Sequence, residues 1–289
     1  MRKLLAILLS LAMILSFAAC GNSGAQETSS TETTSIPGIE DGVLTVAMEC
    51  AYAPYNWAQV DDSNGAVKIK DSIMYANGYD VMTAKNIADY LGVELEIVQL
   101  DWDSLIPAVQ SGVVDSVIAG QSMTAERMES VNFAGPYLYA SIVCLVKNTS
   151  EYASAKGISD LAGASCTSQS GTIWYDSCLP QIDGADIQTP QESAPAMLMA
   201  VETGTVDFVC TDMPTAQGAL IAYPDLVILD FSDSGDDFEV SDEDINIGIS
   251  IAKENTELMD AINEYLDALT ADDFNDLMAK AIEVQPLSE

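Results

Sequence analysis

The sequence predicts an α/β protein with two similar lobes. Short apolar stretches typical of buried strands alternate with amphipathic stretches typical of helices, and this order indicates strands joined by helical crossovers. The scheme starts again near residue 141. Two helix endings also match, because "IPAVQSGVVDSVIAG" and "MLMAVETGTVDFVCTD" each run from a helix through Gly and Val-Asp into an apolar strand. A repeated pattern of this kind favours two α/β lobes of related design.

The first half of the chain contains three expected strands, "VLTVAM", "ELEIVQL" and "VDSVIAG". The helix "YDVMTAKNIADYLG" is expected to end at Gly92 and the helix "DSLIPAVQSG" at Gly112, since glycine often ends a helix. Thr124 is the expected N-cap of the helix "TAERMES", because its hydroxyl can accept a main-chain N–H. The β-α-β-α-β order predicts a parallel sheet.

The second half repeats the alternation. Strands are expected in "SIVCLVKN", "ASCTSQSG", "VDFVCTD" and "INIGISIAK". Helices are expected in "ISDLAG", "TIWYDSCLPQI", "SAPAMLMAVETG" and "MPTAQGALIAYP", and the chain closes with helices. The acidic, turn-rich segment 230–245 is interpreted as a solvated loop.

The first 19 residues have the features of a secretory signal peptide. Arg2 and Lys3 form a positive start, residues 4–17 are almost continuously apolar, and small residues precede Cys20. The ending "FAAC" resembles the lipobox of bacterial lipoproteins, although Phe17 replaces the usual Leu. The resemblance implies cleavage just before Cys20 and acyl chains on Cys20 that hold the protein on a membrane. The alternative is ordinary secretion.

Residues 20–39 are interpreted as a disordered tether after the lipidated Cys20. They are rich in Ser, Thr and Gly and have no apolar period with which to build a core. No later segment is long and apolar enough to span a bilayer. We therefore expect the mature protein at the cell membrane, lipid-anchored and facing the extracellular side.

Composition excludes several classes of function. The formal net charge is −35, and nucleic-acid binding requires a basic surface that such a chain lacks. The chain has no His and no CxxC motif, so we predict neither a metal site nor a cofactor. Five cysteines remain besides Cys20, and an odd number cannot all pair within the chain. Runs such as "FVCT" and "IVCLV" favour buried thiols that pack as small apolar groups.

The residues that directly follow the expected strands are the candidate ligand site, because ligands of open α/β sheets bind beyond the carboxyl ends of strands. These positions are 49–55, 119–127, 170–174 and 211–213. Arg127 lies among them, and a guanidinium can bind a carboxylate through two hydrogen bonds while keeping its proton. A surface ion pair with a neighbouring Glu is the alternative for this residue.

Six motifs occur in an order that resembles the polar amino-acid-binding proteins of bacterial ABC importers, also called solute-binding protein family 3. They are "LTVAMECAYAPYNW", "NGYDVMTAKNIADYLG", "WDSLIPAVQSGVVDSVIAGQSMTAER", "VNFAGPYLYASIVCLV", "SQSGT" and "VETGTVDFVCTD". The resemblance covers residues 40 to about 285 and implies the type II periplasmic-binding-protein fold, in which lobe closure buries a ligand. It implies hinges at 136–141 and 243–248, a first lobe at 40–138 and 247–289, and a second lobe at 139–246.

The resemblance also implies roles for individual residues. Arg127 would bind the α-carboxylate of an amino acid, with Ser122 and Thr172 adding hydroxyl or main-chain donors. Asp212 would bind the α-ammonium, although in so acidic a chain a chance Asp is the alternative. Gly120 stands where some relatives carry a hydroxyl residue, so its carbonyl would be the polar group there.

Two tyrosines and one glutamate complete the expected site. Tyr52 and Tyr79 match the aromatic walls of the family, and the core face of a helix is the alternative for Tyr79. Trp102 is expected in the core. Glu49 matches a position where many members carry an acidic residue that reaches the ligand side chain. Since Arg127 and Asp212 balance a zwitterion, Glu49 favours a cationic side chain, or a glutamine-like one, and disfavours an acidic one.

The resemblance implies a binding protein that delivers a free amino acid to the permease subunits of an ABC importer, acting as a monomer and not as an enzyme. An enzyme on the same fold, similar to cyclohexadienyl dehydratase, is one alternative, because a fold does not fix a function. Such chemistry needs a general acid or base beside the ligand, and Glu49 is the residue available for it. A ligand-sensing subunit of a membrane receptor is the other alternative.

Overall fold

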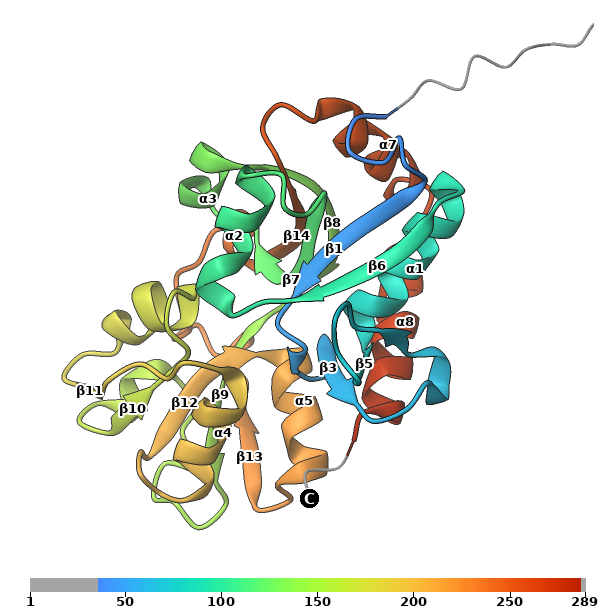
Figure 1. The fold of residues 1–289 in the computed structure, drawn as a ribbon. Coiled ribbons are helices and arrows are strands. Elements are labelled where there is room, and N and C mark those ends of the chain that lie inside the picture. Colours follow the sequence, from blue (N-terminus) through green and yellow to red (C-terminus); the bar gives the residue numbers. More distant parts are fainter. Residues whose placement is uncertain (1–35, 287–289) are drawn as a thin grey trace, which may run out of the picture. The chain divides into compact units, whose positions relative to one another are not determined.

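The computed structural model describes residues 36–286, and Figure 1 labels most of its helices and strands. The first lobe contains a five-stranded sheet with the strand order β6-β1-β7-β14-β8. The bounds of these strands are β1 Val43–Met48, β6 Glu94–Gln99, β7 Ser116–Ser122, β8 Asn132–Tyr139 and β14 Asn246–Ile251. The β1 and β7 strands are almost wholly buried, as the apolar runs in the sequence predict.

The second lobe contains another five-stranded sheet, with the order β11-β10-β12-β9-β13. The bounds of these strands are β9 Ile142–Lys147, β10 Ser165–Thr167, β11 Asp186–Ile187, β12 Phe208–Asp212 and β13 Leu226–Leu229. The strand expected in "ASCTSQSG" is β10, which is only three residues long. The residues after it form a loop that approaches the first lobe.

Both sheets are mixed. The predicted parallel pairing of the strands "VLTVAM", "ELEIVQL" and "VDSVIAG" is confirmed, and antiparallel strands that were not predicted complete each sheet. In the first sheet β1 is parallel to β6 and β7, whereas β14 is antiparallel to β7 and β8. In the second sheet β10 is parallel to β11 and β12, whereas β9 is antiparallel to β12 and β13. The antiparallel strands, β14 and β9, are the two that enter each sheet from the other lobe. No helical crossover within the lobe constrains their direction.

A third, four-stranded sheet with the order β2-β3-β5-β4 covers residues 51–77 and was not predicted. Its strands are β2 Ala51–Tyr52, β3 Asn56–Gln59, β4 Val67–Lys68 and β5 Tyr75–Asn77. Strands of two to four residues carry too little alternation to be recognised from sequence. This small sheet holds the loop after β1, which carries Tyr52 and Tyr55 into the interior.

Eight α-helices occur in the described residues. They are α1 Tyr79–Leu91, α2 Trp102–Gln110, α3 Ala125–Ser130, α4 Ala194–Glu202, α5 Met213–Ala222, α6 Asp242–Ile245, α7 Thr256–Leu266 and α8 Ala271–Val284. Gly92 adopts the left-handed conformation at the end of α1, with φ of 72°. The Thr124 side chain accepts a hydrogen bond from the Arg127 main chain, so the predicted end at Gly92 and the predicted cap at Thr124 are confirmed. The helix α2 ends at Gln110, and Gly112 follows in the left-handed conformation with φ of 70°.

Shorter helical turns replace two of the expected helices. The bounds of these turns are η1 Ser63–Gly65, η2 Ile158–Leu161, η3 Trp174–Cys178 and η4 Leu179–Gln181. The η3 turn is a π-helix, and it places the Trp174 side chain in the interior. The acidic segment 230–245 is mostly loop, as predicted, but it ends in α6 and buries Phe231 and Phe238.

The predicted signal peptide and Cys20 lie outside the described residues. Residues 36–39 were assigned to the tether, yet here they pack on the first lobe: Ile39 is buried, and Asn255 donates a hydrogen bond to the Pro37 carbonyl at 2.7 Å. Within residues 36–286, no helix has the length and apolar character needed to cross a membrane. The five cysteines of this region are all free and buried, which agrees with the apolar runs around them.

Candidate functional site

The residues that follow the strands of both lobes meet where the lobes face each other. Glu49 follows β1, Ser122 ends β7, and Asp212 ends β12, while the loop after β10 carries Gln169 and Thr172. All five end or follow strands that run parallel to a neighbouring strand, and parallel strands end at a common edge of their sheet. The topology thus brings together side chains that are far apart in the sequence.

The Arg127 guanidinium links the two lobes through main-chain carbonyls. Its Nη1 donates to the Ser122 carbonyl at 2.9 Å, and its Nη2 donates to the Gly171 carbonyl of the second lobe at 3.0 Å. The guanidinium also lies over the Trp102 ring, 5.4 Å from the ring centre. Burial lowers the pKa of Arg127 to about 10, so the group stays protonated at neutral pH. A cavity of about 470 Å³ lies beside it, and Thr172 lines this cavity as well.

A second cavity, of about 480 Å³, is lined by Trp102 and is strongly acidic. Glu49, Asp101 and Asp103 of the first lobe line it together with Glu192 of the second, and none of the described residues that line it is Lys or Arg. Glu49 is the buried member of the set, with 7% of its surface exposed, and the other three are exposed. We call this space the acidic cavity.

Glu49 has no cationic partner within residues 36–286. Its Oε2 accepts one long hydrogen bond, 3.5 Å, from the Gln169 side chain of the second lobe. Burial raises the pKa of Glu49 to about 7, and the nearby Asp101 and Asp103 raise it further while the Gln169 bond lowers it. A positive group placed in the acidic cavity would therefore stabilise the Glu49 carboxylate.

Asp212 is buried, and each of its two carboxylate oxygens accepts a hydrogen bond from the protein. Its Oδ1 accepts the Thr215 main-chain N–H at 2.8 Å, as the N-cap of α5, and its Oδ2 accepts the Tyr52 hydroxyl at 2.6 Å. Burial raises the pKa of Asp212, and these hydrogen bonds oppose the shift. Asp212 lines neither of the two cavities described above.

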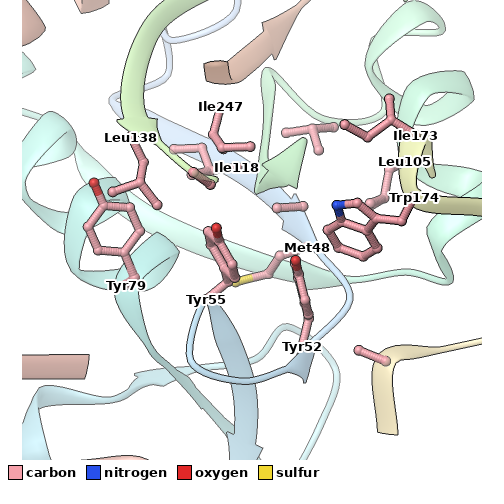
Figure 2. Packing of buried hydrophobic residues seen from close by; sticks show 14 of the residues in the cluster. Met48, Tyr52, Tyr55, Tyr79, Leu105, Ile118, Leu138, Ile173, Trp174 and Ile247 are labelled. Carbon is pink, nitrogen blue, oxygen red and sulfur yellow. The ribbon is translucent and has the colours of Figure 1, made fainter. Parts of the chain in front are cut away.

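The two predicted aromatic walls lie in a row of buried tyrosines (Figure 2). The Tyr52 and Tyr55 rings stack with centres 4.7 Å apart, and Trp174 of the second lobe lies 6.2 Å from Tyr52 on centres. Tyr79 lies beyond Tyr55, stacks on Tyr137 and donates its hydroxyl to the Tyr137 carbonyl. This placement fits the core alternative for Tyr79, whereas Tyr52 reaches the second lobe.

The three remaining predicted residues act through the main chain or are bonded locally. Gly120 has φ of +63°, and a Cβ at this position would lie 2.7 Å from Cε1 of Tyr52, so the position requires glycine. The Ser122 carbonyl is occupied by Arg127. The Thr172 hydroxyl donates to the Gln169 carbonyl at 2.7 Å. All three residues thus lie beside other residues of the candidate site: Gly120 beside Tyr52, Ser122 beside Arg127, and Thr172 beside Gln169.

Three further residues at this place were not predicted from the sequence. Trp102, expected in the core, is partly exposed, and its indole N–H donates to the Gly171 carbonyl at 3.4 Å. Gln169 binds Glu49. Asp80 is fully buried beside the tyrosines, accepts hydrogen bonds from Tyr137 and Asn56, and has its pKa raised to about 7 by burial. Trp102 follows shortly after the end of β6, and this position is the sequence feature from which its place at the ligand site could have been predicted.

The arrangement can hold a ligand that carries opposite charges at separate points. A cation lies at Arg127, buried carboxylates lie at Glu49 and Asp212, and Trp102 both contacts Arg127 and lines the acidic cavity. Among residues 36–286, no cluster of side chains has the composition of a metal site. The chemistry available is ionic and hydrogen-bonded recognition of a small polar molecule.

Comparison with known proteins agrees with this geometry. A probable histidine-binding protein from Campylobacter jejuni is 26% identical over 286 residues, which cover 99% of this chain and 100% of that protein. A solved amino acid ABC transporter substrate-binding protein from Streptococcus pneumoniae, bound to L-arginine, superposes with a TM-score of 0.74 at 25% identity, covering 86% of this chain and 97% of that chain.

A third similar structure is that of the ancestral amino acid-binding protein AncCDT-1, a precursor of cyclohexadienyl dehydratase. Its TM-score is 0.68 at 28% identity, with 84% of this chain and 97% of that chain covered. The model of the bacterial extracellular solute-binding proteins, family 3, matches residues 44–283. The chain belongs to this family, and it is an amino-acid-binding protein of the ABC-transporter type.

Proposed function

We propose that the protein captures an α-amino acid with a cationic side chain and delivers it to the permease of an ABC importer. The observation that carries the proposal is the acidic cavity, in which Glu49 is buried without a cation while three further carboxylates surround it. An unpaired buried carboxylate is unfavourable, and a cationic side chain would compensate it. Lysine, arginine or histidine is expected to bind ahead of glutamine, and glutamate and aspartate are expected to be rejected.

Arg127 is proposed to bind the α-carboxylate of this ligand. Its two observed hydrogen bonds go to neutral carbonyls, and the nearby Glu126 and Asp176 attract it without forming an ion pair. The guanidinium has five N–H donors, and the remaining ones can bind a carboxylate. Asp212 is proposed to bind the α-ammonium. The relatives support the same ligand class, since one is a probable histidine-binding protein and another binds L-arginine.

A thermal-shift screen of the twenty amino acids, followed by calorimetry, tests the proposal. A ligand that binds only the folded state raises the melting temperature. Arginine, lysine or histidine should give the largest increase, and glutamine a smaller one. Tight binding of glutamate, with no response to any cationic amino acid, would refute the proposal.

The protein is proposed to bind its ligand without converting it. The similarity to a precursor of cyclohexadienyl dehydratase raises the opposite possibility, and Glu49, with its pKa near 7, is the group that a proton transfer would use. The proposal assigns Glu49 to charge compensation instead. Mass spectrometry of ligand recovered after long incubation with the protein decides: an unchanged mass supports binding alone, and a changed mass supports an enzyme.

We also propose that the mature protein is a monomer anchored outside the cell membrane by acyl chains on Cys20. The sequence of the first 20 residues supports this, as does membership of an extracellular family. Replacing Cys20 by Ser should leave the leader uncut or release the domain, with no change in ligand affinity. Membrane fractionation identical to that of the wild type would contradict the anchor.

A further inference from the structure

Asp80 is a buried carboxylate to which the proposed function gives no role. It is the second residue of α1, its surface is wholly buried, and it lines neither of the two cavities described above. Its Oδ1 accepts the Tyr137 hydroxyl at 2.6 Å, and its Oδ2 accepts the Asn56 side-chain amide at 2.7 Å. Tyr137 and Asn56 are wholly buried as well. Burying a carboxyl group costs free energy, and these two hydrogen bonds compensate part of that cost.

One hydrogen bond of Asp80 leads to the residue that follows Glu49. Asn56 donates to Asp80 through its amino group, and its side-chain oxygen accepts the Cys50 main-chain N–H at 2.7 Å. This orientation of the amide is the one that satisfies both neighbours, because a reversed amide would set its amino group against the N–H and its oxygen against the carboxylate. Cys50 comes directly after Glu49, so the two bonds together fix the main chain beside Glu49.

The Cys50 main chain has a conformation that requires such support. Its φ is +55°, in the left-handed region that residues with a side chain seldom adopt. A strained conformation of this kind persists only where the surrounding structure holds it, and such conformations are common at ligand sites. Cys50 lies between Glu49, which lines the acidic cavity, and the strand β2. The direction of the Glu49 side chain therefore depends on how Cys50 is held.

The other hydrogen bond of Asp80 leads to Gly120. Tyr137 donates its hydroxyl to Asp80, and the same hydroxyl accepts the Gly120 main-chain N–H at 3.1 Å. Gly120 is also left-handed, with φ of +63°, and its carbonyl is the group that the family resemblance assigns to the ligand. The two oxygens of one carboxylate are thus connected, through one side chain each, to two separate segments of the candidate site.

The main chain of Asp80 is itself bonded to the loop that carries Asn56. The Asp80 N–H donates to the Tyr55 carbonyl at 2.8 Å. Gly78, just before α1, has φ of +123°, and a Cβ at this position would overlap the Tyr55 carbonyl. The start of α1 therefore packs directly on the loop, and the carboxylate of Asp80 has a fixed position relative to Asn56.

We propose that Asp80 is a positioning residue for the ligand site, which acts on Glu49 through one oxygen and on Gly120 through the other. The inference rests on the proposed function for the role of Glu49, whereas the hydrogen bonds that carry it lie wholly within the first lobe. A carboxylate suits this place because two donors point at it, and its two acceptor oxygens satisfy both. General support of the core would change the stability of the protein but not its preference among ligands.

The experiment exchanges the two members of the Asp80–Asn56 pair. Asn56→Asp places two carboxylates opposite each other, and Asp80→Asn places an amino group opposite one of the two donors, so each single variant loses a hydrogen bond. The double variant restores the bonds. The amide at position 80 then donates to the carboxylate at position 56 and accepts the Tyr137 hydroxyl, while that carboxylate still accepts the Cys50 N–H.

Asp115→Asn is the matched control. Asp115 is another carboxylate of the first lobe that accepts a main-chain N–H, from Thr45 at 2.8 Å, but Thr45 lies toward the start of β1 and Glu49 follows its end. Calorimetry with arginine and with glutamine gives the ratio of the two affinities, which reports the placement of Glu49 because the cationic ligand depends on its charge. Hydrogen exchange at the Cys50 and Gly120 N–H groups, measured by NMR without ligand, reports the two segments directly.

Asn56→Asp should lower the ratio of arginine to glutamine affinity about tenfold, since it weakens a hydrogen bond between charged groups. The Cys50 N–H should exchange faster in this variant, and at least one of the two N–H groups should exchange faster in Asp80→Asn. The double variant should return the ratio and the exchange rates to those of the wild type. Asp115→Asn should change neither.

A wild-type ratio in Asn56→Asp overturns the proposal. A double variant that does not fold, or that folds without recovering the ratio, overturns it as well, and this variant decides alone where the single variants do not fold. If arginine does not bind the wild type, the proposed function is wrong, and the exchange rates of the two N–H groups then decide whether Asp80 holds both segments.

Discussion

The two cavities between the lobes are nearly equal in size and differ in one group: carboxylates line both, but among the described residues only the cavity beside Arg127 contains a cation. The cavity beside Arg127 measures about 470 Å³ and the acidic cavity about 480 Å³. In the first, a cation is bonded to neutral carbonyls; in the second, a buried carboxylate is bonded to a neutral amide. Neither Arg127 nor Glu49 takes part in an ion pair within residues 36–286.

The comparison shows how a very acidic protein can keep a charged side chain free of ion pairs, so that the side chain can bind a ligand. An ion pair between Arg127 and a nearby carboxylate would neutralise the guanidinium before any ligand arrived. Carbonyl partners fix its position without cancelling its charge, and Gln169 does the same for Glu49. Glu126 and Asp176 attract Arg127 without forming an ion pair, so both Arg127 and Glu49 can still bind an oppositely charged ligand group. Substitutions at the two ends can separate these roles.

The largest effect is expected at Arg127. Arg127→Met leaves the ligand carboxylate facing an apolar group, and the loss of binding free energy should be roughly 2–5 kcal/mol. Arg127→Lys should lose less, because it keeps the charge but lacks the planar fork. Calorimetry with the best ligand measures both. Unchanged affinity in the two variants would place Arg127 outside the ligand site, and the cavity beside it would then have no role in binding.

Glu49→Gln should produce the next largest effect, and a selective one. The variant keeps the shape of the side chain and removes its charge, so arginine affinity should fall by about 1.5–3 kcal/mol, the usual value of a charged hydrogen bond. Glutamine affinity should change much less, because an amide can bond to either residue. Parallel titrations with the two ligands provide the measurement and the internal control. Equal losses for both ligands would indicate a general structural effect.

Affinity for a cationic ligand should depend on pH through Glu49. The pKa of this carboxyl is about 7 without ligand, and a cation favours its charged form, so binding releases a proton below pH 7. Arginine affinity should fall up to tenfold for each pH unit below about 7. Calorimetry in two buffers of different ionisation enthalpy counts the released proton. Glu49→Gln should abolish most of the dependence, and a flat profile in wild type would contradict the assignment.

Whereas arginine affinity should increase as pH rises toward 7, the stability of the ligand-free protein should decrease as pH rises. Glu49 and Asp80 both have folded pKa values of about 7, above their ordinary values of 4.5 and 3.8. A carboxyl whose pKa is raised by folding stabilises the fold at low pH, and this contribution is lost as pH rises through about 7. The melting temperature of the ligand-free protein should therefore decrease between pH 5 and pH 8, with each group contributing on the order of 3 kcal/mol. Saturating arginine should reduce the decrease, since it compensates Glu49.

The smallest effect is expected at the rim of the acidic cavity. Asp103 is exposed, so its attraction for a ligand cation is screened by water and salt. Asp103→Asn should weaken arginine binding by about 0.5 kcal/mol or less, and 0.5 M NaCl should remove the difference. A loss as large as that of Glu49→Gln would mean that burial does not distinguish the two carboxylates.

Much of the fold followed from local pattern. The strand β1, the helix α1 with its end at Gly92, and the cap at Thr124 were predicted, because apolar periodicity and cap chemistry depend on neighbouring residues. The placement of Glu49, Arg127 and Asp212 after strand ends also led to the interlobe region, since parallel strand–helix units align those ends. The family resemblance supplied the two lobes, and the comparisons confirmed that family.

The rest depended on which distant segments meet. Sequence by itself determined the longer strands, most of the helices, the charge and the residue types available at the strand ends. Tertiary structure alone decided that β9 and β14 enter antiparallel, that Trp102 faces the second lobe, and that Tyr52 reaches Asp212 across 160 positions. Helix and strand signals act over a few residues, whereas contacts between lobes depend on the shape that both sheets present to each other, and no local period encodes that shape.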